Sequence, residues 1–250
     1  MKRQLLLAVL LLPFTKLLAA PGLATAPVEP VQHIAVRFHL VTDLEMAKKG
    51  VKMTNWLTAD MISKTVMPEL NRIWSAAAIE WTLSGVSLAT TRNENRAEVI
   101  AYLLAAGRDS DGKSDPQRIA KMTYLLNLEQ EDPKAVNLYV IPYLGGTSQG
   151  NATPRQNRVL LGQWTDKPSR GLRPPEKCLL IEEGEFRQGS FGRTVAHELG
   201  HILGLTHPKN NEPPFHRLMG GNKPAYDLTS EEKSLARKTA ATLFSKSKPK

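Results

Sequence analysis

Three histidines within eleven residues constrain this chain more than any other feature of its sequence. His197 and His201 are four residues apart, so on a helix their side chains lie on one face, about one turn apart. Gly204 stands where such a helix must end, because glycine adopts the positive φ of a sharp reversal without steric cost. The reversal brings His207 back toward the other two histidines. The sequence therefore predicts a helix over 190–203 that ends in a tight turn.

Three imidazoles in this arrangement are typical of a catalytic zinc site, in which three protein ligands leave a fourth position open. The candidate zinc (Zn2+) ligands are His197, His201 and His207. Cys178 is the only cysteine, so the sequence excludes a zinc site built from several cysteines and an intramolecular disulfide. Glu198 follows the first ligand at an offset of about 100° around the helix, which places its carboxylate beside the metal. We expect Glu198 to take a proton from the attacking water and to pass it to the leaving amine.

The pattern His197-Glu198-x-x-His201-x-x-Gly204-x-x-His207 resembles the zinc signature of the metzincin metallopeptidases. The resemblance implies a secreted zinc-dependent endopeptidase that hydrolyses protein or peptide substrates. It also implies a metzincin-like α/β (α+β) fold, with a mixed twisted sheet, an active-site helix and a smaller C-terminal subdomain below the cleft. Substrate would bind in an extended conformation along an edge strand, which we expect within 147–163.

A second feature of the resemblance lies downstream of the histidines. Metzincins have a Met-turn, which places a methionine beneath the zinc ligands, and Leu218-Met219-Gly220 follows His207 at a suitable distance. The resemblance implies that Met219 is this structural methionine. The stretches Gly192-Arg193-Thr194 and Leu228-Thr229-Ser230-Glu231 look most like those of matrixin-like and pappalysin-like bacterial secreted members.

Hydrophobic periodicity predicts alternating strands and helices, which indicates a mixed α/β sheet. Pro68 is expected to kink or restart the first helix, and Thr229 begins a capping box with Glu232. The expected strands are 33–41, 79–89, 135–144, 158–164 and 178–182, and the expected helices are 58–78, 94–106, 116–129, 190–203 and one from 229.

The amino terminus has the layout of a secretory signal peptide. Lys2 and Arg3 precede an unbroken apolar run over 5–12, and small residues follow up to position 24. A membrane anchor is the alternative interpretation, but Pro13 and Lys16 cut the apolar run to about half of the roughly 20 residues that a spanning helix needs. We therefore expect residues 1–24 to be removed on export, with no stable membrane anchor afterwards, and the protein to be secreted or periplasmic. Residues 25–250 would form a single metallopeptidase catalytic domain, with an N-terminal subdomain to about 204 and a C-terminal subdomain over 205–250.

The basic charge of the chain does not indicate nucleic-acid binding. The formal net charge is +9, but the first 24 residues carry three bases and no acid, and residues 231–250 carry six bases and two acids. The excess therefore lies mostly at the two ends, and few aromatic residues are available for stacking on bases. Two other functions remain open. The chain could be a zinc-binding module that binds peptides without cleaving them, against which the presence of Glu198 argues, or a zinc enzyme that acts on a non-peptide amide.

Overall fold

The computed structural model describes residues 30–48, 50–91, 96–97, 100–101, 131–144, 150–164, 166–167, 171–172, 190–208, 217–220 and 226–244. The predicted signal segment, the helix at 116–129 and the strand at 178–182 lie outside these residues. Of the helix at 94–106, only residues 96–97 and 100–101 are described, and they are helical. Within the described part of the chain, no helix is long and apolar enough to span a membrane.

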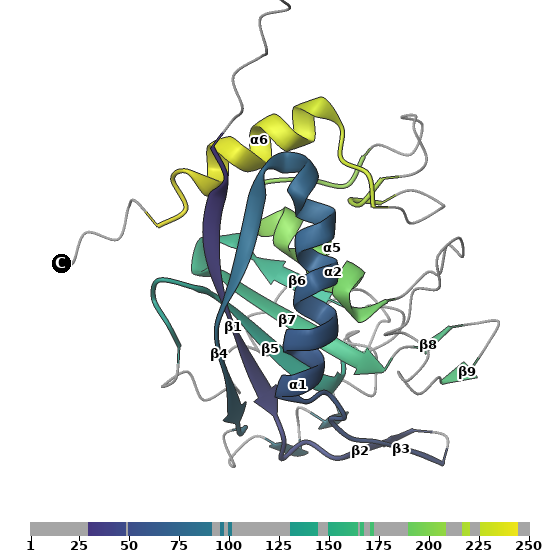
Figure 1. Ribbon diagram of the computed structural model, residues 1–250. Helices are drawn as coiled ribbons and strands as arrows, with labels where there is room; N and C mark the ends of the chain where they lie inside the picture. Colours follow the sequence, from purple (N-terminus) through teal and green to yellow (C-terminus); the bar gives the residue numbers. More distant parts are fainter. Residues whose placement is uncertain are drawn as a thin grey trace, which may run out of the picture.

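A five-stranded mixed sheet forms the centre of the fold, which confirms the predicted α/β class (Figure 1). The strand order is β4-β1-β5-β7-β6. The β1–β4, β1–β5 and β5–β7 pairs are parallel, whereas β6 runs antiparallel to β7 and forms one edge. The strands are β1 (Gln32–Val41), β4 (Ile79–Ala89), β5 (Val136–Tyr143), β6 (Gly150–Thr153) and β7 (Arg158–Trp164), of which all but β6 were predicted as separate strands.

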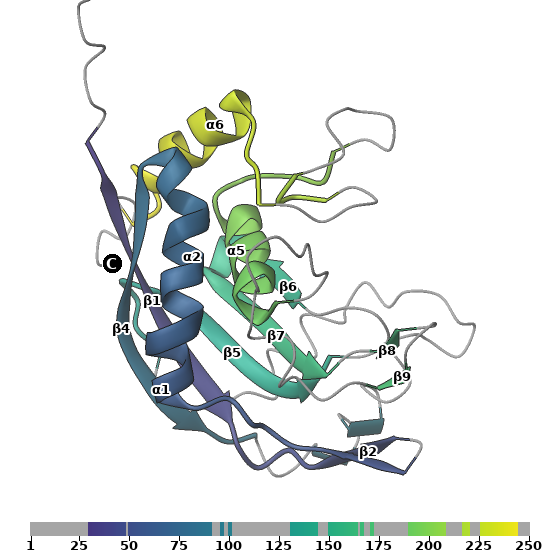
Figure 2. The same ribbon diagram turned by 45° about the vertical axis from the view of Figure 1, so that its right-hand side comes forward.

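Two helices lie on the same side of the sheet, α2 (Met67–Trp74) and α5 (Phe191–Ile202) (Figure 2). All eight residues of β5 are buried, as expected for a central strand that is covered on both faces. The larger apolar core lies between the sheet and these helices. A second apolar cluster contains Tyr139 and Tyr143 of β5 together with Met46 and Met53. Two short hairpins complete the described strands: β2 (Met46–Lys48) with β3 (Val51–Met53), and β8 (Asp166–Lys167) with β9 (Gly171–Leu172).

Pro68 restarts the first helix, as the sequence predicts. A short helical turn, α1 (Ala59–Met61), is capped by Thr58, whose side chain accepts a hydrogen bond from the backbone of Met61. The chain then widens into a π-helical turn over Ile62–Val66 before α2 begins. Proline has no N–H, and its ring clashes with the carbonyl four residues earlier in a regular α-helix. The wider π-helical turn accommodates the proline, and α2 begins directly after it.

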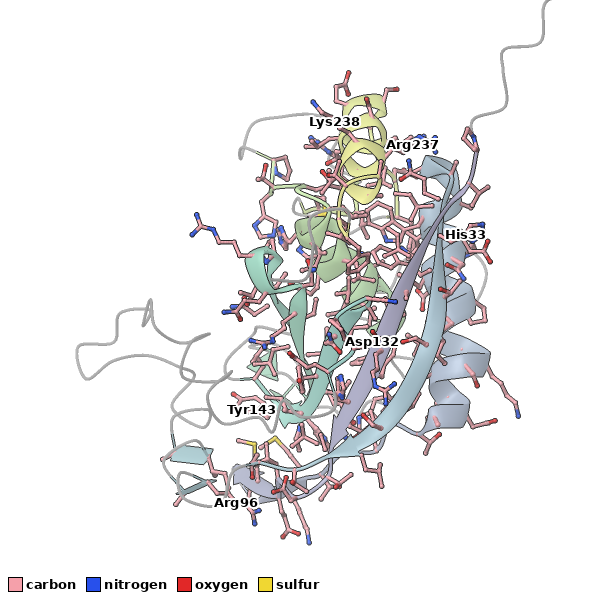
Figure 3. All side chains as sticks on the ribbon, turned by 90° about the vertical axis from the view of Figure 1, so that its left-hand side faces the viewer. His33, Arg96, Asp132, Tyr143, Arg237 and Lys238 are labelled. Atoms are coloured by element: carbon pink, nitrogen blue, oxygen red, sulfur yellow. The ribbon has the colours of Figure 1, made fainter. Side chains whose placement is uncertain are left out.

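Helix α6 (Ser230–Ala240) packs across one end of the molecule and begins with the predicted capping box. The Thr229 side chain accepts from the backbone of Glu232, whose carboxylate accepts from the Thr229 backbone in return. Arg237 donates from Nη1 to the carbonyl oxygens of Ala77 and Ala78 at 3.0 and 3.3 Å, and Figure 3 shows it on α6 beside Lys238. These hydrogen bonds connect α6 to the residues that immediately precede β4.

Candidate metal centre

Helix α5 carries two of the three histidines, and both of its ends are fixed by specific hydrogen bonds. The Ser190 side chain accepts a hydrogen bond from the backbone N–H of Arg193 and caps the first turn. At the other end, Gly204 has φ +83°, and the N–H of Leu205 donates to the carbonyl of Gly200 at 2.9 Å. This is a Schellman motif, which reverses the chain within a few residues. The predicted helix and the predicted turn at Gly204 are both confirmed.

The turn brings the third histidine back to the first two. The Nε2 atom of His207 lies 3.0 Å from Nε2 of His197 and 3.2 Å from Nε2 of His201. Two imidazoles bound to one zinc at 2.0–2.1 Å in tetrahedral geometry have nitrogens about 3.3 Å apart, which is close to these separations. Among the described residues, His197, His201 and His207 form a group that can hold a metal ion.

The ring orientation of two of these histidines is set by backbone carbonyls. Nδ1 of His197 lies 2.7 Å from the carbonyl oxygen of Leu218, and Nδ1 of His201 lies 2.9 Å from that of Leu205. A carbonyl oxygen only accepts, so in each ring the proton is on Nδ1 and the Nε2 lone pair is free to bind a cation. Lone pairs that converge within about 3 Å repel one another unless a cation lies between them. The donor set and its tautomers therefore fit a metal.

Burial keeps these rings neutral. It lowers the pKa of His197 to about 4, and the Leu218 hydrogen bond only partly opposes this effect. Burial also lowers the pKa of His201. His207 is exposed at the mouth of the group. Neutral imidazole is the form that binds a metal, so two of the three candidate ligands are held in the required state.

Glu198 lies beneath the edge strand β6 and is buried. A methyl group on Gly150 would lie 2.5 Å from Oε1 of Glu198 and 2.6 Å from its Cδ, so the strand approaches this carboxylate as closely as glycine allows. Burial raises the pKa of Glu198 to about 8, while a hydrogen bond from the backbone of Ala152 acts in the opposite direction. These contacts place the Glu198 carboxylate between α5 and the edge strand β6.

Met219 is completely buried and packs under α5. A methyl group on Gly200 would lie 3.1 Å from Cε of Met219 and would collide with its sulfur, so the methionine fills the space that this glycine leaves. Met219 thus lies directly below the helix turn that links the two histidines of α5.

Two further interactions hold the turn around Met219. The backbone N–H of Leu218 donates to the carbonyl of Asp227 at 2.8 Å. The guanidinium of Arg217 donates to the carboxylate of Glu232 at 2.7 Å, in a pair whose side chains are 12% and 8% exposed. Glu232 also closes the capping box of α6, so one carboxylate links the turn to that helix.

The other described histidines, His33 and His39, lie outside the group. His33 is exposed and pairs with Glu80 at 3.2 Å. His39 is buried, stacks on the ring of Tyr139 and contacts the Asn137 side chain at 2.9 Å. Both are therefore structural. His216, which lies in the loop after His207, falls outside the described residues.

Sequence reasoning misses five parts of this site. The carbonyls of Leu218 and Leu205, Gly150 and the Ala152 backbone act through main-chain position, and no side-chain pattern indicates them. Arg193, whose guanidinium donates to the Leu218 carbonyl at 3.0 Å, does leave a signal, because it precedes His197 by four residues and so shares its helix face.

Comparison with known proteins adds little to this geometry. No protein-family model matches the sequence, and no curated protein matches it. Among solved structures, the chain is similar to the crystal structure of Archaemetzincin from Methanopyrus kandleri, with a TM-score of 0.44 and 13% sequence identity, over 84% of this chain and 96% of that chain. At this level of similarity, the assignment of a function depends on the site itself.

Proposed function

We propose that the protein is a zinc-dependent endopeptidase of the metzincin type. The observation that carries the proposal is the convergence of three imidazole Nε2 atoms, from His197, His201 and His207, next to the buried carboxylate of Glu198. Three histidines and an adjacent carboxylate beside the edge strand of the described sheet are groups that can carry out hydrolysis of an amide by water.

The three histidines would hold the zinc through Nε2, each as a neutral ligand. When bound, zinc polarises the substrate carbonyl and lowers the pKa of water enough for it to attack at neutral pH. The chain's own contribution is orientation. The carbonyls of Leu218 and Leu205 fix the tautomers of His197 and His201, and such partners of metal ligands strengthen binding as well as position the rings.

Glu198 would move the proton. A zinc ion bound beside it would lower the pKa of Glu198 from its raised value and so favour the ionised form. The carboxylate then accepts a proton from the attacking water, whose oxygen forms a bond to the carbonyl carbon of the substrate amide. The carbon–nitrogen bond then breaks, and Glu198 returns the proton to the leaving nitrogen, which departs as an amine. One carboxylate therefore serves both halves of the reaction as base and then as acid.

Strand β6 would bind the substrate backbone. It is an edge of the sheet and runs antiparallel to β7. An extended peptide can add to such an edge through main-chain hydrogen bonds, which place a peptide bond without fixing its side chains. Because Gly150 and Ala152 of β6 contact Glu198, a peptide on this edge would lie beside the base.

Export and subfamily complete the proposal. We propose that residues 1–24 are a signal peptide and that the mature enzyme is secreted or periplasmic, because a positive start, an apolar run and small residues occur in that order. The stretches around Arg193 and Thr229 support a matrixin-like or pappalysin-like assignment. Amino-terminal sequencing of the native product should begin after about residue 20, and a product that starts at Met1 would contradict export with cleavage.

The test of activity is digestion of a proteome-derived peptide library by the mature protein, with and without a chelator. We expect cleavage that the chelator abolishes and added zinc restores, with one zinc per chain by metal analysis. The variant in which His197, His201 and His207 are all alanine should contain no zinc. Wild-type protein that holds zinc and binds peptides without cleaving any would favour the binding module, and cleavage of small amides alone would favour the non-peptide enzyme.

A further inference from the structure

We propose that Arg193 is a positioning residue of the metal centre, which holds the Leu218 carbonyl where His197 needs its hydrogen-bond acceptor. The inference rests on the proposed function, since it concerns a ligand of the proposed zinc. It adds a residue that acts through the Leu218 carbonyl, in the turn below the histidines.

Arg193, His197 and His201 follow one another at intervals of four residues and form one stripe along α5. Nη2 of Arg193 donates to the carbonyl oxygen of Leu218 at 3.0 Å, and Nδ1 of His197 donates to the same oxygen at 2.7 Å. A carbonyl oxygen has two lone pairs, so one acceptor serves both donors. Two consecutive turns of α5, one with Arg193 and one with His197, therefore donate to the same carbonyl oxygen of Leu218.

The same peptide segment is held from its other side. The Leu218 N–H donates to the Asp227 carbonyl at 2.8 Å, and Met219 follows directly and packs under Gly200. A shift of the Leu218 carbonyl would therefore move the acceptor of His197. It would also disturb the methionine beneath the histidines.

The position of Arg193 is electrostatically unfavourable, which argues for a specific role. It is the third residue of α5, close to the positive end of the helix dipole, where a cation is disfavoured. Its side chain is also partly buried, and burial lowers the pKa of the guanidinium. Both effects disfavour a cation here, so a chain under selection for helix stability alone would not place arginine at this site.

Glu69 on α2 compensates for this charge. Its buried carboxylate accepts a hydrogen bond from the Ser190 hydroxyl at 2.7 Å, and a methyl group on Gly192 would lie 2.9 Å from its Cδ. The carboxylate thus lies against the first turn of α5. Burial raises the pKa of Glu69 and lowers that of Arg193, and the attraction between the two groups opposes both shifts. Glu69 supports the cation, and Arg193 in turn fixes the carbonyl that orients His197.

The test is zinc affinity, measured by competition with a chelator of known affinity. Arg193→Met keeps the length of the side chain and removes the donor, and we expect it to weaken zinc binding about 10- to 100-fold, the usual effect of losing a group that orients a metal ligand. The control is Lys64→Met, which removes an exposed positive charge in the π-helical turn Ile62–Val66 and should leave the affinity unchanged. A second variant, Arg193→Met with Glu69→Gln, removes both charges and carries the test if the single variant does not fold.

A second readout separates positioning from a general loss of structure. In the metal-free protein, the Nδ1 proton of His197 should give a slowly exchanging nuclear magnetic resonance signal that Arg193→Met weakens while the signal of His201 persists. Zinc affinity within about threefold of wild type in either folded variant would overturn the inference, since that change is less than 1 kcal/mol. Because the readout is binding, wild type that holds zinc without cleaving peptides would refute the peptidase alone, whereas wild type that binds no zinc would refute both.

Discussion

Gly150 of the edge strand lies against the carboxylate of Glu198, closer than any residue with a side chain could come. We predict that Gly150→Ala displaces this carboxylate and lowers kcat roughly 10- to 100-fold, because a misplacement of about 1 Å in a catalytic group has effects of this size. Zinc content should not change, since the three atoms nearest to a methyl group on Gly150 all belong to Glu198. Steady-state kinetics and metal analysis on one preparation check both expectations.

The matched control is Gly85→Ala in β4, the opposite edge strand of the sheet. The three atoms nearest to a methyl group there belong to the guanidinium end of the Arg37 side chain, which can move aside by a few tenths of an ångström. Cleavage by this variant should be close to that of wild type. If the two alanine variants were equally active, the close packing of β6 on Glu198 would have no bearing on catalysis.

Met219 should contribute to stability through packing and not through any chemical property of its sulfur. It is fully buried beneath Gly200. Met219→Leu keeps most of the volume and should reduce the free energy of unfolding by less than about 1.5 kcal/mol, whereas Met219→Ala leaves a cavity and should reduce it by about 2–5 kcal/mol. Urea unfolding of the three proteins measures the difference. Equal stabilities for the leucine and alanine variants would contradict the packing account.

His39 should make the fold less stable in mild acid. Burial lowers its pKa below the ordinary value of 6.5, while the Asn137 side chain acts in the opposite direction. The unfolded chain then binds this proton more readily than the folded one, so the stabilising contribution is complete above about pH 6.5 and is lost as the pH falls below it. His39→Gln should show a shallower fall in unfolding free energy between pH 7 and pH 5. Parallel curves for the two proteins would exclude His39 as the cause.

The sequence predicts the elements that depend on local signals. Strands β1 and β4, the restart at Pro68, the turn at Gly204 and the capping box at Thr229 all follow from rules that act within a few residues. The mixed sheet follows from the alternation of strands and helices. The resemblance adds the approximate position of the edge strand, which the structure narrows to Gly150–Thr153.

The remaining features depend on contacts between residues that are far apart in sequence. The Leu218 carbonyl lies 21 residues after His197, and Gly150 precedes Glu198 by 48 residues. Periodicity reports which face of an element is apolar, but it does not report which main-chain atom of a distant loop meets that face. Arg193 can be predicted only in part. Its spacing from His197 shows that the two side chains share a helix face, but it does not show that Arg193 donates to the Leu218 carbonyl.

The central claim is that Glu198 is the proton carrier of a zinc peptidase, and Glu198→Gln tests it most directly. The amide keeps the size of the side chain and can still pack under β6, so the variant should fold and hold one zinc per chain. It cannot accept the proton of water. General acid–base catalysis contributes about 10²–10⁴-fold, and one residue here serves both halves of the reaction, so kcat/KM should fall by about 10⁴-fold or more. Cleavage and zinc content are measured on the same preparation. A variant that holds zinc and cleaves peptides within about tenfold of wild type would contradict the mechanism.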